Sequence, residues 1–303
     1  SITKVAATTL ALMKLYEARE IQINRRLGDY LPIPDTSKVH NLIIKDVLTH
    51  QSGLQSWIPF YLKTIKDTLF ETVYSEMQDS IYRYKVADNL YMRQDYRDSI
   101  FRWIFDAKVS DKPEYRYSDL GFYLFKEMVE EITKMPFEEY LQITFYKSLG
   151  LENTVFKPYE VFENERVVPT EEDRLFRKQL VHNYVHDPGA AMLGGISGHA
   201  GLFSNAEDMA VILQMLLNLG EYGGRRYLEP KTIQYFTRKQ RKDNRRGLGF
   251  DKPEPDIYEP GPTGISASPR SFGHSGFTGT CFWADPDLNL IYVFLSNRIH
   301  PDA

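Results

Sequence analysis

A serine and a lysine three positions apart open the chain, in Ser1-Ile2-Thr3-Lys4. At the start of a helix, side chains with this spacing lie on one face, about 5–6 Å apart between Cβ atoms. The lysine amine can then reach the serine hydroxyl and help to deprotonate it. Tyr117-Ser118-Asp119 can add a phenol, and His274-Ser275-Gly276 can add a strand that carries H-x-G. Together these residues predict a nucleophile, a base and an oxyanion pocket, the parts of a serine acyl-transfer site.

Each of these segments also has a purely structural interpretation. The serine could cap a helix while the lysine stays in solvent, although S-x-x-K occurs only once in the chain. The tyrosine could be a core residue whose neighbours cap the helix that follows. H-x-G occurs twice: His199-Ala200-Gly201 precedes a capped helix, whereas His274-Ser275-Gly276 leads into a strand-like run. We therefore expect the first to be structural and place only the second at the site.

Bulk properties narrow the class of protein. The chain has 303 residues, 42% of them hydrophobic, which suffices for one large core or two lobes. A formal net charge of −4 argues against a nucleic-acid partner that requires overall positive charge. No apolar run approaches the ~20 residues that span a bilayer, and a single cysteine, Cys281, excludes an intramolecular disulfide. Because the chain starts at Ser1 rather than Met, we expect a truncated or processed product.

Helical periodicity dominates the first two thirds of the chain. An apolar repeat that begins directly after the serine predicts a helix over residues 4–19. A capping-box pattern at Ser204-Asn205-Ala206-Glu207 predicts another over residues 207–219. Three further segments are predicted as helical: residues 67–111, 120–132 and 137–146.

The remaining segments indicate turns, a loop and a hairpin. Glycines at positions 194–201 mark a close-packed turn, and the charged, then Pro/Gly-rich residues 238–270 predict a long surface loop. β-rich runs at 278–284 and 290–296 predict an antiparallel hairpin. The expected fold is therefore of the α/β (α+β) type, with an antiparallel sheet flanked by helices and a cleft beside a helical lobe. We expect residues 1–20 and 195–303 to form the sheet-containing lobe, and residues 21–194 the mainly helical one.

Two other clusters have candidate roles outside this site. His182 and His186 are four positions apart, a spacing that can place two metal ligands on one helix face. Asn183 and Pro188 indicate a turn instead, so we expect no metal there. The run from Arg238 to Arg246 holds six basic residues in nine. We expect a solvated loop, with an anionic partner as the alternative.

With these residues placed, the chain resembles the serine β-lactamase and penicillin-recognising hydrolase superfamily, in its class C-like branch. Five blocks in the family's order carry the resemblance: Ser1 to Lys4, and residues 46–54, 117–121, 198–204 and 274–279. Residues 185–187, 245–250 and 296–298 look closest to serine-hydrolase modules joined to the C-terminal side of family 3 β-N-acetylglucosaminidases. That narrower resemblance implies a covalently linked glycoside hydrolase domain upstream.

The resemblance implies a role for each residue of the site. Ser1 would be the acylated nucleophile, Lys4 its proton partner and Tyr117 the base. Backbone N–H groups of Ser1 and Phe277 would form the oxyanion hole, with Gly276 in the same turn. No metal or organic cofactor is implied, and the substrate would be a small molecule or peptide met in the periplasm or outside the cell. The family's fold, like that of DD-peptidases and β-lactamases, also has strands upstream of the serine, which this sequence lacks.

Two residues depart from the family pattern. Asp119 stands where asparagine is usual, and a carboxylate near Lys4 favours the ammonium form, which shifts the role of base towards Tyr117. His274 stands where lysine is frequent, and a partly protonated imidazole is a less dependable clamp for a substrate carboxylate. We therefore expect an amidase, peptidase or esterase for cell-wall-derived peptides or related amides and esters, ahead of strong β-lactamase activity.

Two other functions stay open. An N-terminal-nucleophile hydrolase would use the free α-amine of Ser1 as its base, but it needs no set of lysine, tyrosine and histidine. A non-catalytic penicillin-recognising scaffold would serve as a binding or accessory module of a glycosidase, and Asp119 in place of asparagine favours it. Labelling by a serine-directed phosphonate separates the enzyme from the scaffold.

Overall fold

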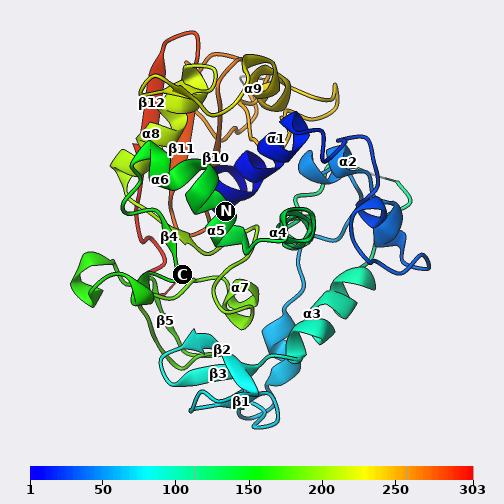
Figure 1. The fold of residues 1–303 in the computed structure, drawn as a ribbon, viewed down its shortest axis with the longest axis vertical. Coiled ribbons are helices and arrows are strands. Elements are labelled where there is room, and N and C mark those ends of the chain that lie inside the picture. Colours follow the sequence, from blue (N-terminus) through cyan, green and yellow to red (C-terminus); the bar gives the residue numbers. More distant parts are fainter. Residues whose placement is uncertain (113, 257, 303) are drawn as a thin grey trace.

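The helix that begins directly after Ser1 lies at the centre of the protein (Figure 1). In the computed structural model, which describes residues 1–112, 114–256 and 258–302, it starts as a π-helix, η1 (Lys4–Thr9), and continues as α1 (Leu10–Glu17). Every residue of η1 is buried, as expected for a helix surrounded by other elements. π-helical turns are frequent at functional sites. The helix predicted over residues 4–19 is confirmed, with a wider first turn.

The other helices pack around this one or extend away from it. Those of α type are α2 (Ile44–Leu48), α3 (Tyr96–Phe105), α4 (Leu120–Thr133), α5 (Phe137–Leu141), α6 (Lys147–Leu149), α7 (Pro188–Met192), α8 (Ala206–Leu217) and α9 (Pro230–Thr237). A second π-helix is η5 (Gln142–Tyr146). Short 3-10 turns are η2 (Leu27–Asp29), η3 (Lys38–Asn41), η4 (Phe60–Thr64), η6 (Pro158–Glu160) and η7 (Asn164–Arg166).

The helices predicted around residues 120–132, 137–146 and 207–219 are therefore confirmed. Only the cap of α8 differs from the prediction: the side chain of Asn205, not that of Ser204, accepts the N–H of Asp208, at 2.8 Å. Within the described residues, no helix is both long enough and apolar enough to cross a membrane.

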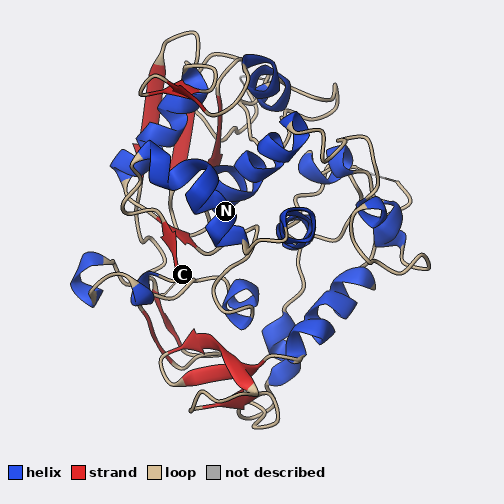
Figure 2. Ribbon diagram, in the orientation of Figure 1, coloured by secondary structure: helices blue, strands red, loops and turns tan. Residues whose placement is uncertain are grey.

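The main sheet is antiparallel, with strand order β10-β11-β12. Its strands are β10 (Phe272–Ser275), β11 (Cys281–Asp285) and β12 (Leu290–Phe294). Helix α8 packs against β11 and β12. The hairpin predicted at residues 278–284 and 290–296 is confirmed, and the register pairs His274 of β10 with Phe282 of β11. Figure 2 shows this sheet at one end of the molecule and smaller strands at the other.

A second small sheet, of order β1-β3-β2, corrects the prediction of helix over residues 67–111. Its strands are β1 (Tyr74–Ser75), β2 (Tyr82–Ala87) and β3 (Leu90–Arg93), and of this segment only residues 96–105 form an α-helix. Aromatic and β-branched residues favour strands, and Tyr82, Tyr84 and Val86 alternate along β2. The mainly helical part of the chain therefore carries a sheet of its own.

Three pairs of short strands complete the structure. They are β4 (Val155–Phe156) with β7 (Leu202–Phe203), β5 (Glu171–Asp173) with β6 (Gln179–Val181), and β8 (Glu221–Tyr222) with β9 (Arg225–Arg226). The described residues between α9 and β10 are irregular, as predicted at 238–270, but residues 246–252 are buried, so the prediction of a surface loop is wrong for that stretch. Residue 257 lies outside the described part. The fold is thus mixed α/β, with small antiparallel sheets and helices, as predicted.

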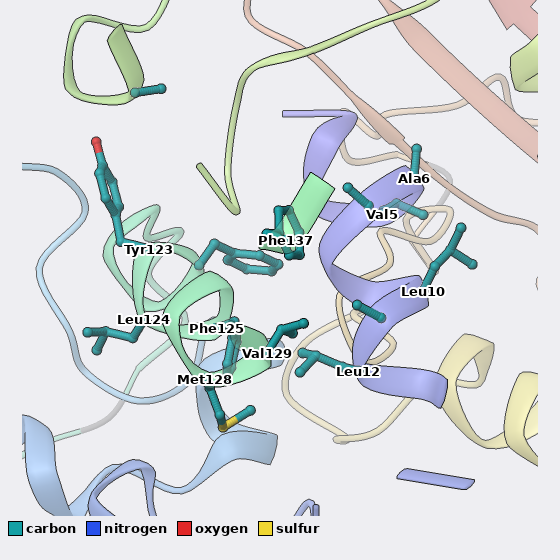
Figure 3. Packing of buried hydrophobic residues seen from close by; sticks show 14 of the residues in the cluster. Val5, Ala6, Leu10, Leu12, Tyr123, Leu124, Phe125, Met128, Val129 and Phe137 are labelled. Carbon is teal, nitrogen blue, oxygen red and sulfur yellow. The ribbon is translucent and has the colours of Figure 1, made fainter. Parts of the chain in front are cut away.

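One hydrophobic core joins the helices to the main sheet. It contains buried side chains of η1, α1, α4, α8 and β11. Figure 3 shows side chains of α1 and α4, among them Leu12 and Val129, filling the space between these two helices, which contact one another. Both residues are fully buried. The helix that carries Lys4 is therefore anchored in the middle of the core.

A glycine-rich turn closes against the same helix, as its composition predicts. A Cβ atom on Gly198 would lie only 2.0 Å from the carbonyl oxygen of Phe122 in α4. The hydroxyl of Thr8 donates to the Gly198 carbonyl at 2.7 Å. Nearby Gly201 has a φ of +116°, which favours glycine. The turn thus ties η1 and α4 together.

Candidate active site

The structure brings the hydroxyl of Ser1 together with two side chains from different elements. Ser1 Oγ accepts a hydrogen bond from Lys4 Nζ at 3.1 Å and another from Tyr117 Oη at 3.3 Å. Lys4 belongs to η1, whereas Tyr117 precedes α4 and is 116 positions away along the chain. A hydroxyl that meets an amine and a phenol at these distances has the geometry of a nucleophile beside proton-transfer groups.

A buried ion pair sets the charge of Lys4. Its ammonium is 2.6 Å from the carboxylate of Asp119, and the side chain of Lys4 is fully buried. Burial alone would lower the pKa of Lys4. The negative charge of Asp119 and the contact between Lys4 and Tyr117 outweigh burial and raise that pKa. Burial likewise opposes ionisation of Asp119, and the charge of Lys4 outweighs it and lowers the pKa of Asp119. Both groups are therefore charged near neutral pH.

The loop after α2 holds Tyr117 in place. His50 adopts a left-handed backbone conformation, and its carbonyl accepts the N–H of Arg116 at 2.9 Å. Its ring nitrogen Nδ1 accepts the N–H of Ser118 at 3.2 Å, and the ring centroids of His50 and Tyr117 are 4.3 Å apart. Hydrogen bonds on both sides of Tyr117 thus fix its backbone. His50, in the segment 46–54, thus supports the segment that carries Tyr117.

His274 lies behind Tyr117 rather than on an open wall of the site. Its ring centroid is 6.0 Å from that of Tyr117, and the residue is 2% exposed. Nδ1 donates to the Ser275 carbonyl at 2.7 Å, which leaves Nε2 to accept from Arg246 Nη1 at 3.3 Å. Burial, and then the charges of Arg246 and Lys4, hold the pKa of His274 well below its usual range. The expectation that His274 is partly protonated is therefore wrong, because its environment keeps the ring neutral. The expectation that it clamps a substrate carboxylate poorly stays a prediction.

Arg246 is the residue that sequence reasoning missed. The sequence predicts a solvated loop at this position, yet Arg246 is only 4% exposed. Nε and Nη2 donate to the hydroxyl of Tyr115 at 3.2 and 3.0 Å, and Nη2 also lies 3.2 Å from a carboxylate oxygen of Asp251. Its neighbour Arg245 pairs with the same carboxylate. The available signal was the apolar segment at residues 247–250 that follows directly, since a basic run that enters the core must bury its last charges.

The turn after β10 comes close to the backbone of Ser1. A Cβ atom on Gly276 would lie 3.8 Å from the backbone nitrogen of Ser1 and 2.5 Å from Thr280 Oγ1. The N–H of Gly276 is already used, because it donates to the Thr280 carbonyl at 2.6 Å. Phe277, the next residue, is 58% exposed and stacks on His186 with ring centroids 5.5 Å apart. The turn therefore places Phe277 close to Ser1.

These groups open into a cavity of about 1240 Å³. Ser1, Tyr117, Asp119 and Phe277 line it, whereas His274 and Gly276 are not among the described residues of its lining. Many of the other lining side chains are apolar or aromatic: Trp57, Tyr61, Phe162, Phe176 and Leu295. A space of this size admits a peptide-sized or smaller acyl donor.

The other histidines that the sequence singled out, at positions 182, 186 and 199, bond to neighbouring groups. His182 Nε2 bonds to the Val167 carbonyl, and His186 lies 3.2 Å from Glu171. They do not share a helix, since residues 179–181 form a strand and α7 begins at Pro188. His199, predicted to be structural, bonds to Asp187 at 2.8 Å. Over the described residues, no group of three or more His, Cys, Asp and Glu side chains is arranged to hold a metal ion.

Comparison with known proteins settles the family. A sequence profile described as Beta-lactamase matches residues 1–303. The chain belongs to the β-lactamase family. A relative from Salmonella typhimurium strain LT2, provisionally named a D-alanyl-D-alanine carboxypeptidase, is 33% identical over 318 residues, covering 99% of this chain and 68% of the relative. A protein of the same name from Salmonella gallinarum is 32% identical with the same coverage.

Solved structures share the family fold at lower identity. A penicillin-binding protein homologue from Caulobacter crescentus has a TM-score of 0.65 at 19% identity, covering 98% of this chain and 76% of the other. EstCE1, a hydrolase with promiscuous acyltransferase activity, has a TM-score of 0.65 at 18% identity, with 98% and 78% covered. A D-stereospecific amidohydrolase from Streptomyces has 0.62 at 16%, with 96% and 78% covered. The protein is thus a β-lactamase-family hydrolase.

Proposed function

We propose that this hydrolase is a serine acyl hydrolase that acts through Ser1, Lys4 and Tyr117 on cell-wall-derived peptides or related amides and esters. One observation carries the proposal: the Ser1 hydroxyl receives both the Lys4 ammonium and the Tyr117 phenol, at 3.1 and 3.3 Å, on the wall of a large cavity. The name of the Salmonella relatives supports a peptide substrate. It also supports a cell-wall-related, exported location, while the linked glycoside hydrolase domain stays a prediction.

In the proposed mechanism Tyr117 is the base, because Asp119 keeps Lys4 charged. The Tyr117 phenolate takes the proton of Ser1 Oγ as that oxygen attacks the substrate carbonyl carbon. Backbone N–H groups of Ser1 and Phe277 stabilise the oxyanion, since that of Gly276 is already bonded to Thr280.

Collapse of the tetrahedral intermediate breaks the bond to the leaving group, which takes the proton from Tyr117. The acyl group is now an ester of Ser1. Tyr117, again a phenolate, removes a proton from water as the water oxygen attacks the ester carbonyl. The second collapse releases the carboxylic acid and returns a proton to Ser1 Oγ.

The surroundings of the site favour amide, peptide and ester substrates over strong β-lactamase activity. His274 is neutral and buried behind Tyr117, so it offers no fixed positive charge to a substrate carboxylate. Lys4 is neutralised by Asp119 and Arg246 is paired with Asp251. Aromatic lining groups such as Trp57 and Phe277 can instead contact an apolar acyl or leaving group.

Phosphonate labelling tests the proposal. A serine-directed fluorophosphonate should add one adduct, counted by intact mass, and Ser1→Ala should abolish it. Ser204→Ala is the matched control, because Ser204 lines the same cavity and should leave labelling intact. Tyr117→Phe should lower kcat by roughly 10²-fold on an ester or amide that the parent protein hydrolyses, which is the scale of a lost general base. Adducts that persist in Ser1→Ala would place the nucleophile elsewhere, and a parent protein that takes no label would support a binding module.

A further inference from the structure

The wall of the cavity beside Ser1 carries more carboxylates than permanent cations. Its described lining has two arginines and six carboxylates, and the carboxylates are Asp119, Glu171, Glu172, Asp173, Asp187 and Asp302. A hollow lined by charges of one sign concentrates their field and attracts the opposite charge. A carboxylate that is already paired attracts a cation least, so the partners of each one decide where a cation would be held.

Five of the six carboxylates have a lysine or an arginine as ion-pair partner. Lys4 pairs with Asp119, Arg177 with Glu171 and Asp173, and Arg174 with Glu172 and Asp302. For Asp187, the ion-pair partner within the described part of the chain is His199, at 2.8 Å. An imidazole carries a charge only when it is protonated. Asp187 is therefore the carboxylate of this lining without a permanent counter-charge.

The carboxylate of Asp187 is held in place through one of its two oxygens. Oδ1 accepts the N–H of Ala190 and bonds to His199 Nε2, both at 2.8 Å, while His199 Nδ1 is fixed by Ser197 Oγ at 2.9 Å. Burial opposes the ionisation of Asp187, but the charge of protonated His199 and the two hydrogen bonds outweigh burial and lower its pKa. The side chain is 19% exposed. Because both bonds end on Oδ1, Oδ2 is left for a ligand in the cavity.

The hydroxyl of Tyr123 is a second sign of a polar ligand at Asp187. Tyr123 is 1% exposed, and its ring stacks on that of His199 at a centroid distance of 4.1 Å. Figure 3 shows its hydroxyl directed away from the other labelled side chains of α4. A Cβ atom on Gly189 would lie 2.0 Å from Tyr123 Oη and 3.3 Å from Asp187 Oδ1, so the hydroxyl ends beside the carboxylate. Among the described residues this hydroxyl has no hydrogen-bond partner, which is costly for a buried group.

We propose that Asp187 binds a positively charged amine of the substrate, so that the protein prefers amides and esters that carry an ammonium group near the scissile carbonyl. The inference rests on the proposed function and names the substrate class of the same site. An ammonium has three N–H donors, enough to bond to Asp187 Oδ2 and Tyr123 Oη together. Asp187 lines the same cavity as Ser1, and its charge also acts on Asp119. The amine is either the free α-amine of a peptide or a basic side chain.

Binding to Ser1→Ala tests this preference without turnover. Two pairs of peptide methyl amides differ in charge but not in size. Alanyl-D-alanine against lactyl-D-alanine reports an α-amine, and acetyl-lysyl-D-alanine against acetyl-2-aminoheptanoyl-D-alanine reports a basic side chain. Calorimetry should show that the charged member of at least one pair binds about tenfold more tightly, an effect between those of exposed and buried ion pairs. The pair that shows the preference identifies the source of the amine.

Variants made in the Ser1→Ala protein assign the preference to one carboxylate. Asp187→Asn can keep the bonds to Ala190 and His199 but removes the charge, so the affinity ratio of that pair should fall close to one. Asp187→Glu keeps the charge and should keep part of the preference. Glu172→Gln is the matched control, because it removes a carboxylate of the same lining that Arg174 already neutralises at 3.4 Å. The ratio should be unchanged in that variant.

The outcomes separate this inference from the proposed function. A ratio near one for both pairs in Ser1→Ala would overturn the inference, and so would a preference that survives in Asp187→Asn, even where phosphonate labelling of Ser1 stands. Should Asp187→Asn fail to fold, Tyr123→Phe decides: it keeps the ring on His199 but should lower the ratio, and an unchanged ratio would contradict the inference. A parent protein that takes no label would remove the proposed function, while the binding ratios would still decide the charge preference.

Discussion

The pair of Lys4 and Asp119 decides the charges at the centre of the site. An asparagine at position 119, as is usual in the family, would leave the buried amine without a counter-charge and favour its neutral form. The carboxylate of Asp119 instead lies 2.6 Å from Lys4 Nζ and favours the charged ammonium. The amine then donates hydrogen bonds but is a poor base. In the proposed mechanism, residue 119 therefore determines whether Lys4 or Tyr117 accepts the proton of Ser1.

The ion pair should be visible in the pH dependence of stability. The lowered pKa of Asp119 contributes stability that is present above its unfolded value, about 3.9, and is lost as pH falls through its folded value. The raised pKa of Lys4 contributes stability that is present below its unfolded value and is lost as pH rises through its folded value. The pair should therefore stabilise most at neutral pH.

Asp119→Asn should lower the free energy of unfolding by about 2–3 kcal/mol at pH 7. This is less than is usual for a fully buried pair, because the Asp119 side chain is 21% exposed. The difference from the parent should begin to shrink as pH falls below the unfolded value of about 3.9, and it should vanish only below the lowered pKa of folded Asp119, where the carboxyl is protonated in both states. Urea unfolding at several pH values measures it. We expect activity to persist, since Tyr117 remains; a difference independent of pH would contradict the charge assignment.

At the scale of elements, the contact between η1 and α4 positions the side chains that surround Ser1, the proposed nucleophile. Lys4 lies on η1, and Tyr117 and Asp119 directly precede α4. Gly198 sits where the two helices meet, bonded to Thr8 and close to the Phe122 carbonyl. A side chain at position 198 would have to displace the backbone of α4, because the nearest atom is the carbonyl oxygen of Phe122.

Gly198→Ala should destabilise the protein by about 1–3 kcal/mol, the usual cost of overpacking a dense interior. It should also lower kcat, because displacement of η1 from α4 separates Lys4 and Ser1 from Tyr117. Gly264→Ala is the control, since a Cβ atom there meets nothing within 4 Å. Denaturant unfolding and ester turnover measure the two effects. Equal stability of the two variants would show that η1 and α4 are not tightly packed at this point.

At the scale of the whole molecule, a single core crosses the boundary expected between the lobes. Buried residues from η1, α1 and α4 belong to the same cluster as those of α8 and β11. The small sheet of β1, β2 and β3 and the main sheet lie at opposite ends, with the helix of Lys4 between them (Figure 1). Such a core predicts one cooperative unfolding unit rather than two.

Leu12→Ala tests this at a fully buried position of α1. It should cost about 2–5 kcal/mol through lost burial and the cavity left behind. Tryptophan fluorescence and far-UV circular dichroism should give coincident transitions, displaced equally from those of the parent. Leu288→Ala, at a residue 61% exposed, should leave both almost unchanged. Separate transitions for the two probes would indicate that the lobes unfold independently.

Local patterns were sufficient for several helices of the core and for the hairpin of the main sheet. The apolar repeat after Ser1, the helix at 120–132 and the hairpin near residues 281–294 all depend on spacing within one segment, and each is present. The strands at residues 74–93 were mistaken for helix, because a polar, aromatic-rich segment carries no clear period and its pairing partners decided its conformation. The residue that caps α8 is Asn205 and not the predicted Ser204, because neighbouring serine and asparagine side chains can each cap a helix.

The sequence by itself determined the family, through short motifs whose order along the chain is specific. The sequence also predicted that Asp119 lies near Lys4, and in the structure the two side chains form an ion pair. Tertiary structure alone decided the charge of His274 and the burial of Arg246. The protonation of a side chain depends on which groups surround it and how much water reaches it. Those groups come from distant segments, Tyr115 and Asp251 among them, so no local pattern in the basic run could reveal them.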